Sequence, residues 1–304
     1  MSFWRAVALG GIIAVLLPPS PTLFGRFALI GIPIGIYLIA FQWRRPFSLV
    51  FGLALLMVLL VGFRGDPEPG AYLWRGWGLL IGGGFVVATA LAPDRGLFNR
   101  ALSGLVIAMA VVAVIALVRP EALESLDGRI TAQYNQFFLL VEMGAERWGG
   151  AREATALLRT ISIAVYPAMI ALASVSALCI ASYLARLLGG GEAALTPLGS
   201  FRFNDYLAWS LIVGLVLLVA PVGAWGVRAG GNIVMFMGGL YVMRGLAVLV
   251  WLRTTMVSSG RWIAVWLVAA VLFYPVTLGT ALVMGLSDTW LDLRSGLGVE
   301  PKEM

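Results

Sequence analysis

The chain has 304 residues and a net charge of +6, and 61% of its residues are apolar whereas only 12% are charged. An ordinary globular protein has roughly 45–50% apolar and about 25% charged residues, so a soluble fold could not cover this much apolar surface. We therefore predict a polytopic membrane protein. Its inventory of reactive side chains is small, because it has no histidine, one cysteine (Cys179) and one lysine (Lys302).

These absences exclude several kinds of chemistry. Without histidine there is no Ser-His triad and no imidazole metal ligand. A single cysteine forms no intrachain disulfide and no thiolate zinc site, and a lysine near the end of the chain supplies no P-loop. We expect a non-enzymatic protein without a cofactor or a metal. The scattered arginines indicate contact with lipid phosphates rather than with nucleic acid.

Five apolar runs in residues 1–118 predict an N-terminal membrane region, because a spanning helix needs about 20 apolar residues. The first run, from about Phe3 to Leu17, is short and ends at prolines, so it is either an uncleaved first span or a re-entrant helix. The other four predicted spans cover residues 26–42, 47–63, 73–92 and 101–118.

Residues 119–158 differ from the rest of the chain. They hold six of the fifteen acidic residues, and their apolar residues recur at steps of three or four, which predicts one or two amphipathic helices outside the membrane, broken at Gly144 and at Gly149-Gly150. A helix that binds anionic lipid is rich in arginine, whereas this segment is mixed to acidic. We expect a helical cap that packs on the bundle or on a partner protein.

Four further spans are predicted in a C-terminal membrane region, residues 159–286, and a short polar tail follows at 287–304. The spans cover residues 161–187, 206–225, 231–252 and 262–286. The predicted fold is therefore an all-α transmembrane bundle of nine spans, or of eight if the first helix is re-entrant. The arginines of the short loops favour a cytoplasmic N-terminus.

Charges inside the predicted spans are rare. We find no Asp or Glu well inside any of them, so a carboxylate for proton or sodium coupling is missing. Arg244 is the one charge within a span, and a lipid-facing arginine there costs at least about 2–3 kcal/mol. It either extends toward the interface near Trp251 or faces the bundle interior, where backbone carbonyls, Tyr241 or an anionic ligand would bind it.

Three other polar positions are candidate ligand contacts. Asn232 opens a predicted span, either as a helix N-cap or as a donor that lines a cavity. Tyr166 and Tyr274 each precede a proline and combine a phenol with a helix irregularity, for which a structural kink is the favoured reading over a binding site.

The end of the last predicted span carries a second polar group. Asp288 and Asp292 are four residues apart and would share one face of a helix. With Trp290 and Arg294 they predict an interfacial cap, in which Ser287 or Asp288 closes the start of a helix. A magnesium site is the less favoured alternative, because a second such cluster would be needed.

Three motifs in the second half of the chain resemble the YybS-like family of predicted bacterial membrane proteins, a family of unknown function. They are Phe201-Arg-Phe-Asn-Asp205-Tyr-Leu-Ala-Trp209, then Tyr241-Val-Met-Arg-Gly245-Leu-Ala-Val after Asn232, and Gly285-Leu-Ser-Asp288-Thr-Trp290-Leu-Asp-Leu-Arg294. The resemblance is best over residues 201–294. Where an uncharged polar residue, often glutamine, is expected in the family, this chain has Arg244.

The family is in turn similar to the substrate-binding S components of energy-coupling-factor importers, whose energy comes from an ATPase in other chains. The resemblance implies a subunit that binds a small solute or lipid in a pocket and associates with other membrane subunits. Its ligand would contact Asn232, Tyr241, Arg244, Tyr166 and Tyr274. The alternative is a membrane scaffold or assembly factor, which would dock a partner on an exposed apolar stripe of the amphipathic segment formed by Leu126, Ile130, Tyr134, Phe137 and Val141.

Overall fold

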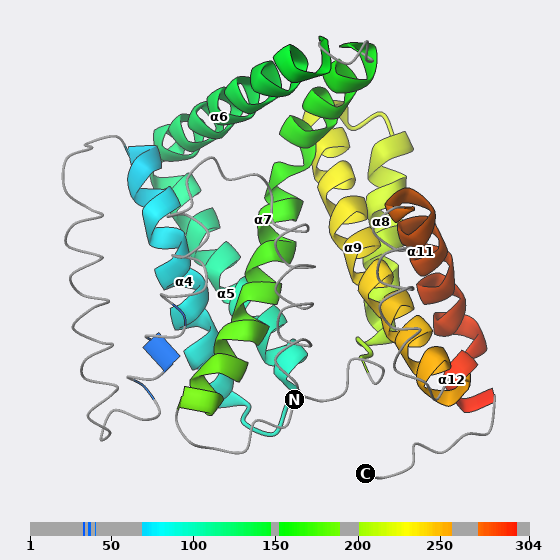
Figure 1. The fold of residues 1–304 in the computed structure, drawn as a ribbon. Helices are drawn as coiled ribbons and strands as arrows, with labels where there is room; N and C mark the ends of the chain where they lie inside the picture. Colours follow the sequence, from blue (N-terminus) through cyan, green and yellow to red (C-terminus); the bar gives the residue numbers. More distant parts are fainter. Residues whose placement is uncertain are drawn as a thin grey trace. The chain divides into compact units, whose positions relative to one another are not determined.

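The computed structural model describes residues 69–146, 152–188, 201–256 and 273–296, together with positions 33, 36, 37 and 40. Within these ranges every regular element is a helix and no strand occurs, which confirms the predicted all-α class. The chain divides into two compact units, Met1–Ala193 and Ala194–Met304 (Figure 1). The N-terminal membrane region and the amphipathic segment, predicted as separate regions, thus belong to one unit.

Several predicted segments lie outside the described residues. They are the spans at 3–17 and 47–63, most of the span at 26–42, the beginning of the span at 262–286, the Gly149-Gly150 pair, and the tail after residue 296.

Four of the described helices are long and apolar enough to cross a membrane. These spans are Pro69–Leu91, Leu97–Val118, Thr155–Ser182 and Gly223–Leu252, and two shorter apolar helices cover Asp205–Val219 and Val276–Leu291. Only 22% of the most apolar span, Leu97–Val118, is buried within the protein. Its remaining apolar surface points outward, which is the arrangement expected when lipid rather than water surrounds a helix.

In the first unit, α4 (Pro69–Leu91) and α5 (Leu97–Val118) form a helical hairpin, close to the predicted spans at 73–92 and 101–118. Their backbones meet where Gly84 faces Gly104, since a Cβ atom on Gly84 would lie 2.5 Å from the Gly104 carbonyl oxygen. Small residues at such a crossing let membrane helices approach closely.

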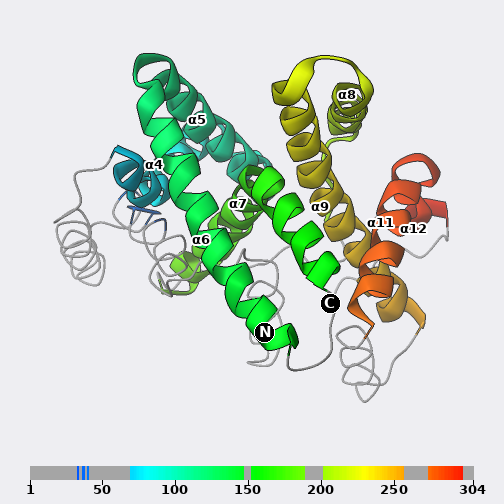
Figure 2. The same cartoon turned by 90° about the horizontal axis from the view of Figure 1, so that it is seen from above.

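The amphipathic segment forms one uninterrupted helix, α6 (Pro120–Glu146), so the predicted break at Gly144 is wrong. Figure 2 shows α6 lengthwise, with α4 seen nearly end-on beneath it. The two helices touch at the beginning of α4, where a Cβ atom on Gly70 would lie 2.5 Å from the Leu126 amide nitrogen.

The predicted exposed stripe on α6 is also wrong over most of its length. Ile130 and Tyr134 are only 3% and 8% exposed, and they form a core cluster with Phe138 and Tyr166. Leu126 and Phe137 pack against the same cluster, and Val141 is the one exposed member of the five. The apolar stripe is therefore covered by the unit itself.

The last helix of this unit, α7 (Arg152–Leu188), begins nine residues before the predicted span at 161–187. It continues through Pro167. The Tyr166 hydroxyl donates to Oδ1 of Asp127 on α6 at 2.8 Å. Farther along, Nε1 of Trp77 on α4 donates to the Ser174 hydroxyl at 2.9 Å.

The second unit begins with the short 3-10 helix η2 (Asp205–Leu207) and α8 (Ala208–Val219). A tight turn then leads into α9 (Gly223–Met256), where Gly223 takes a φ of +78° that favours glycine. The loop predicted between the spans, at residues 226–230, therefore lies inside α9, and the observed turn between α8 and α9 comes earlier in the chain. Asn232 consequently lies inside α9 and is no N-cap, and its side-chain amide donates to the Arg228 carbonyl at 2.8 Å.

The last long helix, α11 (Tyr274–Leu291), continues five residues beyond the predicted end of the span at 286. Ser287 and Asp288 are thus inside this helix and do not close the start of a new one. Asp292 ends the helix in the left-handed conformation with a φ of 39°, and the four-residue helix α12 (Leu293–Gly296) follows.

Three small residues bring α9 and α11 into backbone contact. A Cβ atom on Gly245 would collide with the Ala281 carbonyl oxygen, and one on Gly285 would collide with the Tyr241 carbonyl oxygen. The crossing therefore requires glycine at both positions. Because Arg244 adjoins Gly245 and Asp288 lies three residues after Gly285, the same contact brings these two charged residues together.

We predict that Gly285→Ala lowers the stability of the protein by about 1–3 kcal/mol, the usual cost of forcing a methyl group into a packed contact. Gly279→Ala on the same helix is the matched control, because a Cβ atom there would meet nothing within 4 Å. Unfolding of the purified protein in detergent measures both variants. Equal stabilities for the two would contradict the described crossing.

Candidate functional site: a buried arginine–aspartate network

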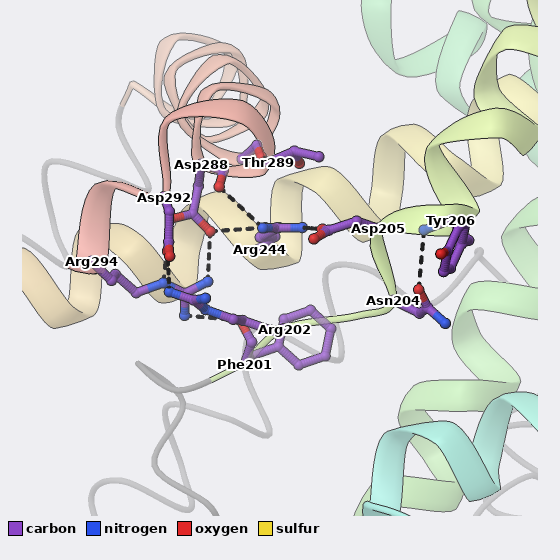
Figure 3. Close-up of polar contacts among 11 residues, drawn as sticks. Phe201, Arg202, Asn204, Asp205, Tyr206, Arg244, Asp288, Thr289, Asp292 and Arg294 are labelled. Carbon is purple, nitrogen blue, oxygen red and sulfur yellow. Dashed lines mark hydrogen bonds and ion pairs between the residues drawn. The ribbon is translucent and has the colours of Figure 1, made fainter. Parts of the chain in front are cut away.

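Arg244 on α9 is held between two carboxylates. Its Nε donates to Oδ2 of Asp288 on α11 at 2.8 Å, and its Nη1 donates to Oδ1 of Asp205 at 2.6 Å. Its Nη2 reaches the backbone carbonyl of Asp288 at 3.1 Å. The side chain is only 3% exposed, so Arg244 faces the interior of the unit and not the surrounding lipid (Figure 3).

Asp288 is the centre of the network. Its side chain is fully buried, and the Arg294 guanidinium binds the same carboxylate oxygen as Arg244, with Nη2 at 2.7 Å from Oδ2 (Figure 3). Nη1 of Arg294 donates to the Phe201 carbonyl at 3.0 Å. Arg294 therefore ties α12 to α11 and to the segment before η2.

The segment from Phe201 to Asp205 closes the network from the N-terminal side. Asn204 starts η2, because its side-chain oxygen accepts a hydrogen bond from the Tyr206 amide at 3.1 Å, and this places Asp205 beside Arg244. Phe203 is 4% exposed and packs edge-on against the Tyr241 ring at 5.2 Å. The Arg244 guanidinium lies 5.3 Å from the centre of the Phe203 ring, a favourable cation–π distance.

The charges of the buried side chains in the network balance only when the exposed carboxylate of Asp205 is counted with them. Arg244, Asp288 and Arg294 are all buried, and two positive charges with one negative charge leave this trio at +1. The carboxylate of Asp205 neutralises it, and that side chain is 65% exposed. An unpaired charge in a low-dielectric interior is costly, so the buried trio depends on an anion at its solvent-facing edge.

A second ion pair joins Arg202 and Asp292 beside the trio. Their side chains are 44% and 48% exposed, and the pair adds no net charge. Ion pairs this exposed contribute little to stability because water and salt screen them.

The residues predicted to form a ligand pocket are distributed over both units. Tyr166 belongs to the first unit, where it bonds to Asp127. Tyr241 and Arg244 lie together on α9, and both contact the Phe203 ring. Asn232 lies about three turns earlier on the same helix. Tyr274 is the first residue of α11. Tyr241 and Arg244 therefore belong to one cluster in the second unit, whereas Tyr166 belongs to the core of the first unit.

The four residues predicted as an interfacial cap have different environments. Asp288 and Arg294 are buried and belong to the network, whereas Asp292 ends α11 and pairs with Arg202. The Trp290 side chain is 75% exposed. Asp288 lies in the last turn of the short apolar helix Val276–Leu291, beyond the predicted end of the span at 286.

Sequence reasoning missed Asp205, Arg202 and Phe203 as parts of the site. Their motif was noted only for its resemblance to a family, because they precede a predicted span and read as a polar linker. No group of three or more cysteine, aspartate or glutamate side chains in the described ranges could hold a metal ion.

We predict that Asp288→Asn destabilises the protein by about 3–5 kcal/mol, because it leaves two buried guanidinium groups without their shared carboxylate. Asp292→Asn, the matched control at an exposed pair, should cost less than about 1 kcal/mol. Unfolding in detergent compares the variants. Replacing Arg244 by Gln in the Asp288→Asn background should recover part of the loss, and purely additive effects would contradict direct coupling of the two side chains.

Comparison with family models, curated proteins and solved structures gives no match to this chain. The geometry and charge of the network are therefore the basis for inferring a function.

Proposed function

We propose that the chain is a multi-pass protein of the bacterial inner membrane that binds a small anionic solute, or the anionic headgroup of a lipid, at the network around Arg244. It acts as a binding subunit of a transport system, like the S components implied by the YybS-like resemblance. One observation carries the proposal: the buried trio has a charge of +1, and the carboxylate that neutralises it is exposed.

The exposed position of Asp205 supports exchange with a ligand. A carboxylate or phosphate oxygen from outside could replace Oδ1 of Asp205 at Nη1 of Arg244 without uncovering Asp288 or Arg294. Guanidinium groups form strong charge-assisted hydrogen bonds to these oxygens. The remaining trio would stay neutralised throughout, because one anion replaces another.

Other subunits would supply the energy for transport. The chain has no P-loop lysine and no histidine, and the buried carboxylate of Asp288 is held between two arginines, which disfavours its use as a proton carrier. These features fit a binding subunit better than an autonomous pump.

The alternative function, a scaffold that docks a partner on the amphipathic segment, would need a different surface from the one predicted. The residues proposed for docking, apart from Val141, pack inside the first unit.

Mass spectrometry of molecules that co-purify with the protein from native membranes tests the proposal. We expect an anionic solute or lipid with the unaltered protein, and at least a tenfold lower amount with Arg244→Gln, because the guanidinium that binds it is gone. Arg202→Gln, which removes the exposed neighbouring arginine, should retain the ligand. The same co-purifying molecules at the same level in both variants would contradict a site at Arg244.

The proposed orientation has a separate test. In a Cys179→Ala background, Asp94→Cys in the turn between α4 and α5 should react with a membrane-impermeant maleimide only after the cytoplasmic side is opened. Glu124→Cys on α6 should react in intact cells, because α5 crosses the membrane between these positions. Labelling of both positions from the same side would contradict a membrane-spanning α5.

A further inference from the structure

The exposed edge of the arginine–aspartate network lies at one end of the α8–α9 hairpin. A Cβ atom on Gly214 of α8 would lie 2.9 Å from the Ile233 side chain of α9, and this contact fixes the register of the two antiparallel helices (Figure 1). Each step back along α8 then matches one step forward along α9. Asp205, nine residues before Gly214, is therefore level with a point two residues before Arg244, in agreement with the ion pair between them.

An exposed tryptophan marks the opposite end of this hairpin. Trp225 is the third residue of α9, directly after the turn, and its side chain is 78% exposed. It lies nineteen residues before Arg244, a length of about 28 Å at 1.5 Å per residue. The hydrocarbon core of a bilayer is about 30 Å thick, and tryptophan and tyrosine are enriched at both of its surfaces. The two ends of the hairpin therefore match the two surfaces of the core.

Aromatic side chains also surround the exposed edge of the network. Tyr206 directly follows Asp205, and its side chain is 80% exposed and extends away from Arg244 (Figure 3). Trp209 of α8 and Trp290 of α11 are 66% and 75% exposed. The exposed edge thus lies among the side chain types that mark a membrane–water interface.

The candidate span of α9 is longer than one hydrocarbon core. Gly223–Leu252 measures about 45 Å at 1.5 Å per residue, about 15 Å more than the core, so part of it lies in the headgroup layers. With Trp225 at one surface of the core, the other surface falls near Arg244. A deeper network would expose the Asp205 carboxylate to hydrocarbon, which is costly. Arg244 is therefore at the depth of the lipid headgroups.

Toward the bilayer core, α8 exposes only apolar side chains. Every exposed residue between positions 209 and 219 is apolar. Four of these residues follow one another at steps of three or four and share one face of the helix, which we call the α8 face. They are Trp209, Ile212, Val213 and Val216. The α8 face begins one turn after Asp205 and leads away from the network toward the other surface of the bilayer.

A phospholipid satisfies both parts of this arrangement. Its phosphodiester carries one negative charge, which complements the charge of +1 on the buried trio, and phosphate oxygens form charge-assisted hydrogen bonds with guanidinium groups. Its acyl chains would cover the α8 face. A soluble anion would match the charge but would leave this apolar face without a partner.

We propose that the network binds the phosphodiester of an anionic phospholipid, whose acyl chains lie along the α8 face. The inference rests on the proposed anion site at Arg244 and narrows its ligand to a lipid. A phosphate oxygen replaces Oδ1 of Asp205 at Nη1 of Arg244, and the displaced carboxylate turns toward water.

Native mass spectrometry of the full chain in a neutral detergent tests this inference. The probes are dioleoyl phosphatidylglycerol, dioleoyl phosphatidylcholine with the same acyl chains, and glycerol phosphate as a soluble anion. We expect phosphatidylglycerol to bind at least about tenfold more tightly than phosphatidylcholine, whose own ammonium group opposes the charge of the trio. Excess glycerol phosphate should not displace it, because this anion has no chains for the α8 face.

Two variants separate the contributions of the charge and of the apolar face. Arg244→Gln should weaken phosphatidylglycerol binding at least about tenfold, since it removes the guanidinium. The double variant Trp209→Gln, Val213→Gln, at exposed positions, should weaken it by a similar factor because the acyl chains lose apolar contacts. The matched control is Val222→Gln at the other end of the hairpin, which should bind as the unaltered protein does.

The outcomes distinguish the lipid from the site itself. Glycerol phosphate that binds as tightly as phosphatidylglycerol, and that Arg244→Gln no longer binds, would overturn the lipid inference while leaving an anion site at Arg244. Binding of both probes that is unchanged in Arg244→Gln would overturn the site and this inference together. Equal affinities for the two phospholipids, or no loss in the double variant, would also contradict the proposed lipid.

Discussion

The second unit depends on the placement of one guanidinium group. Arg244 lies on a helix apolar enough to cross a membrane, where an arginine without partners would be costly. Its two carboxylate partners come from separate elements, Asp288 from α11 and Asp205 from η2, so satisfying this charge fixes the relative positions of three segments. The small residues at the α9–α11 crossing make the arrangement possible, because they let the backbones approach until Arg244 reaches Asp288.

The network combines a buried interior with an exposed edge. Asp288 and Arg294 are shielded from solvent and hold each other in place, and a change there would leave a buried charge unpaired. Asp205 is mostly exposed, and its negative charge offsets the net charge of the buried trio. Such an arrangement suits the binding of an anion, since the interior can remain intact while the outer carboxylate is replaced.

In the first unit, as in the second, small residues let neighbouring helices pack closely. Glycines bring α4 and α5 together within the span, and α6 covers the end of this hairpin with its apolar face. Because α7 is much longer than α4, its beginning extends past the hairpin together with the end of α6.

Composition and hydropathy alone determined the helical class, the apolar spans at 73–92 and 101–118, and the choice of Arg244 as the residue to explain. These follow from local properties, because a run of apolar residues needs no knowledge of its neighbours. The partners of Arg244 did not follow, since Asp205 is 39 residues away and Asp288 is 44 residues away along the chain. Likewise, periodicity identified the apolar stripe of α6, but only tertiary packing decided that Tyr134 is buried while Leu140 is exposed. Which face of a helix is covered depends on the helices beside it, and that information is not local in the sequence.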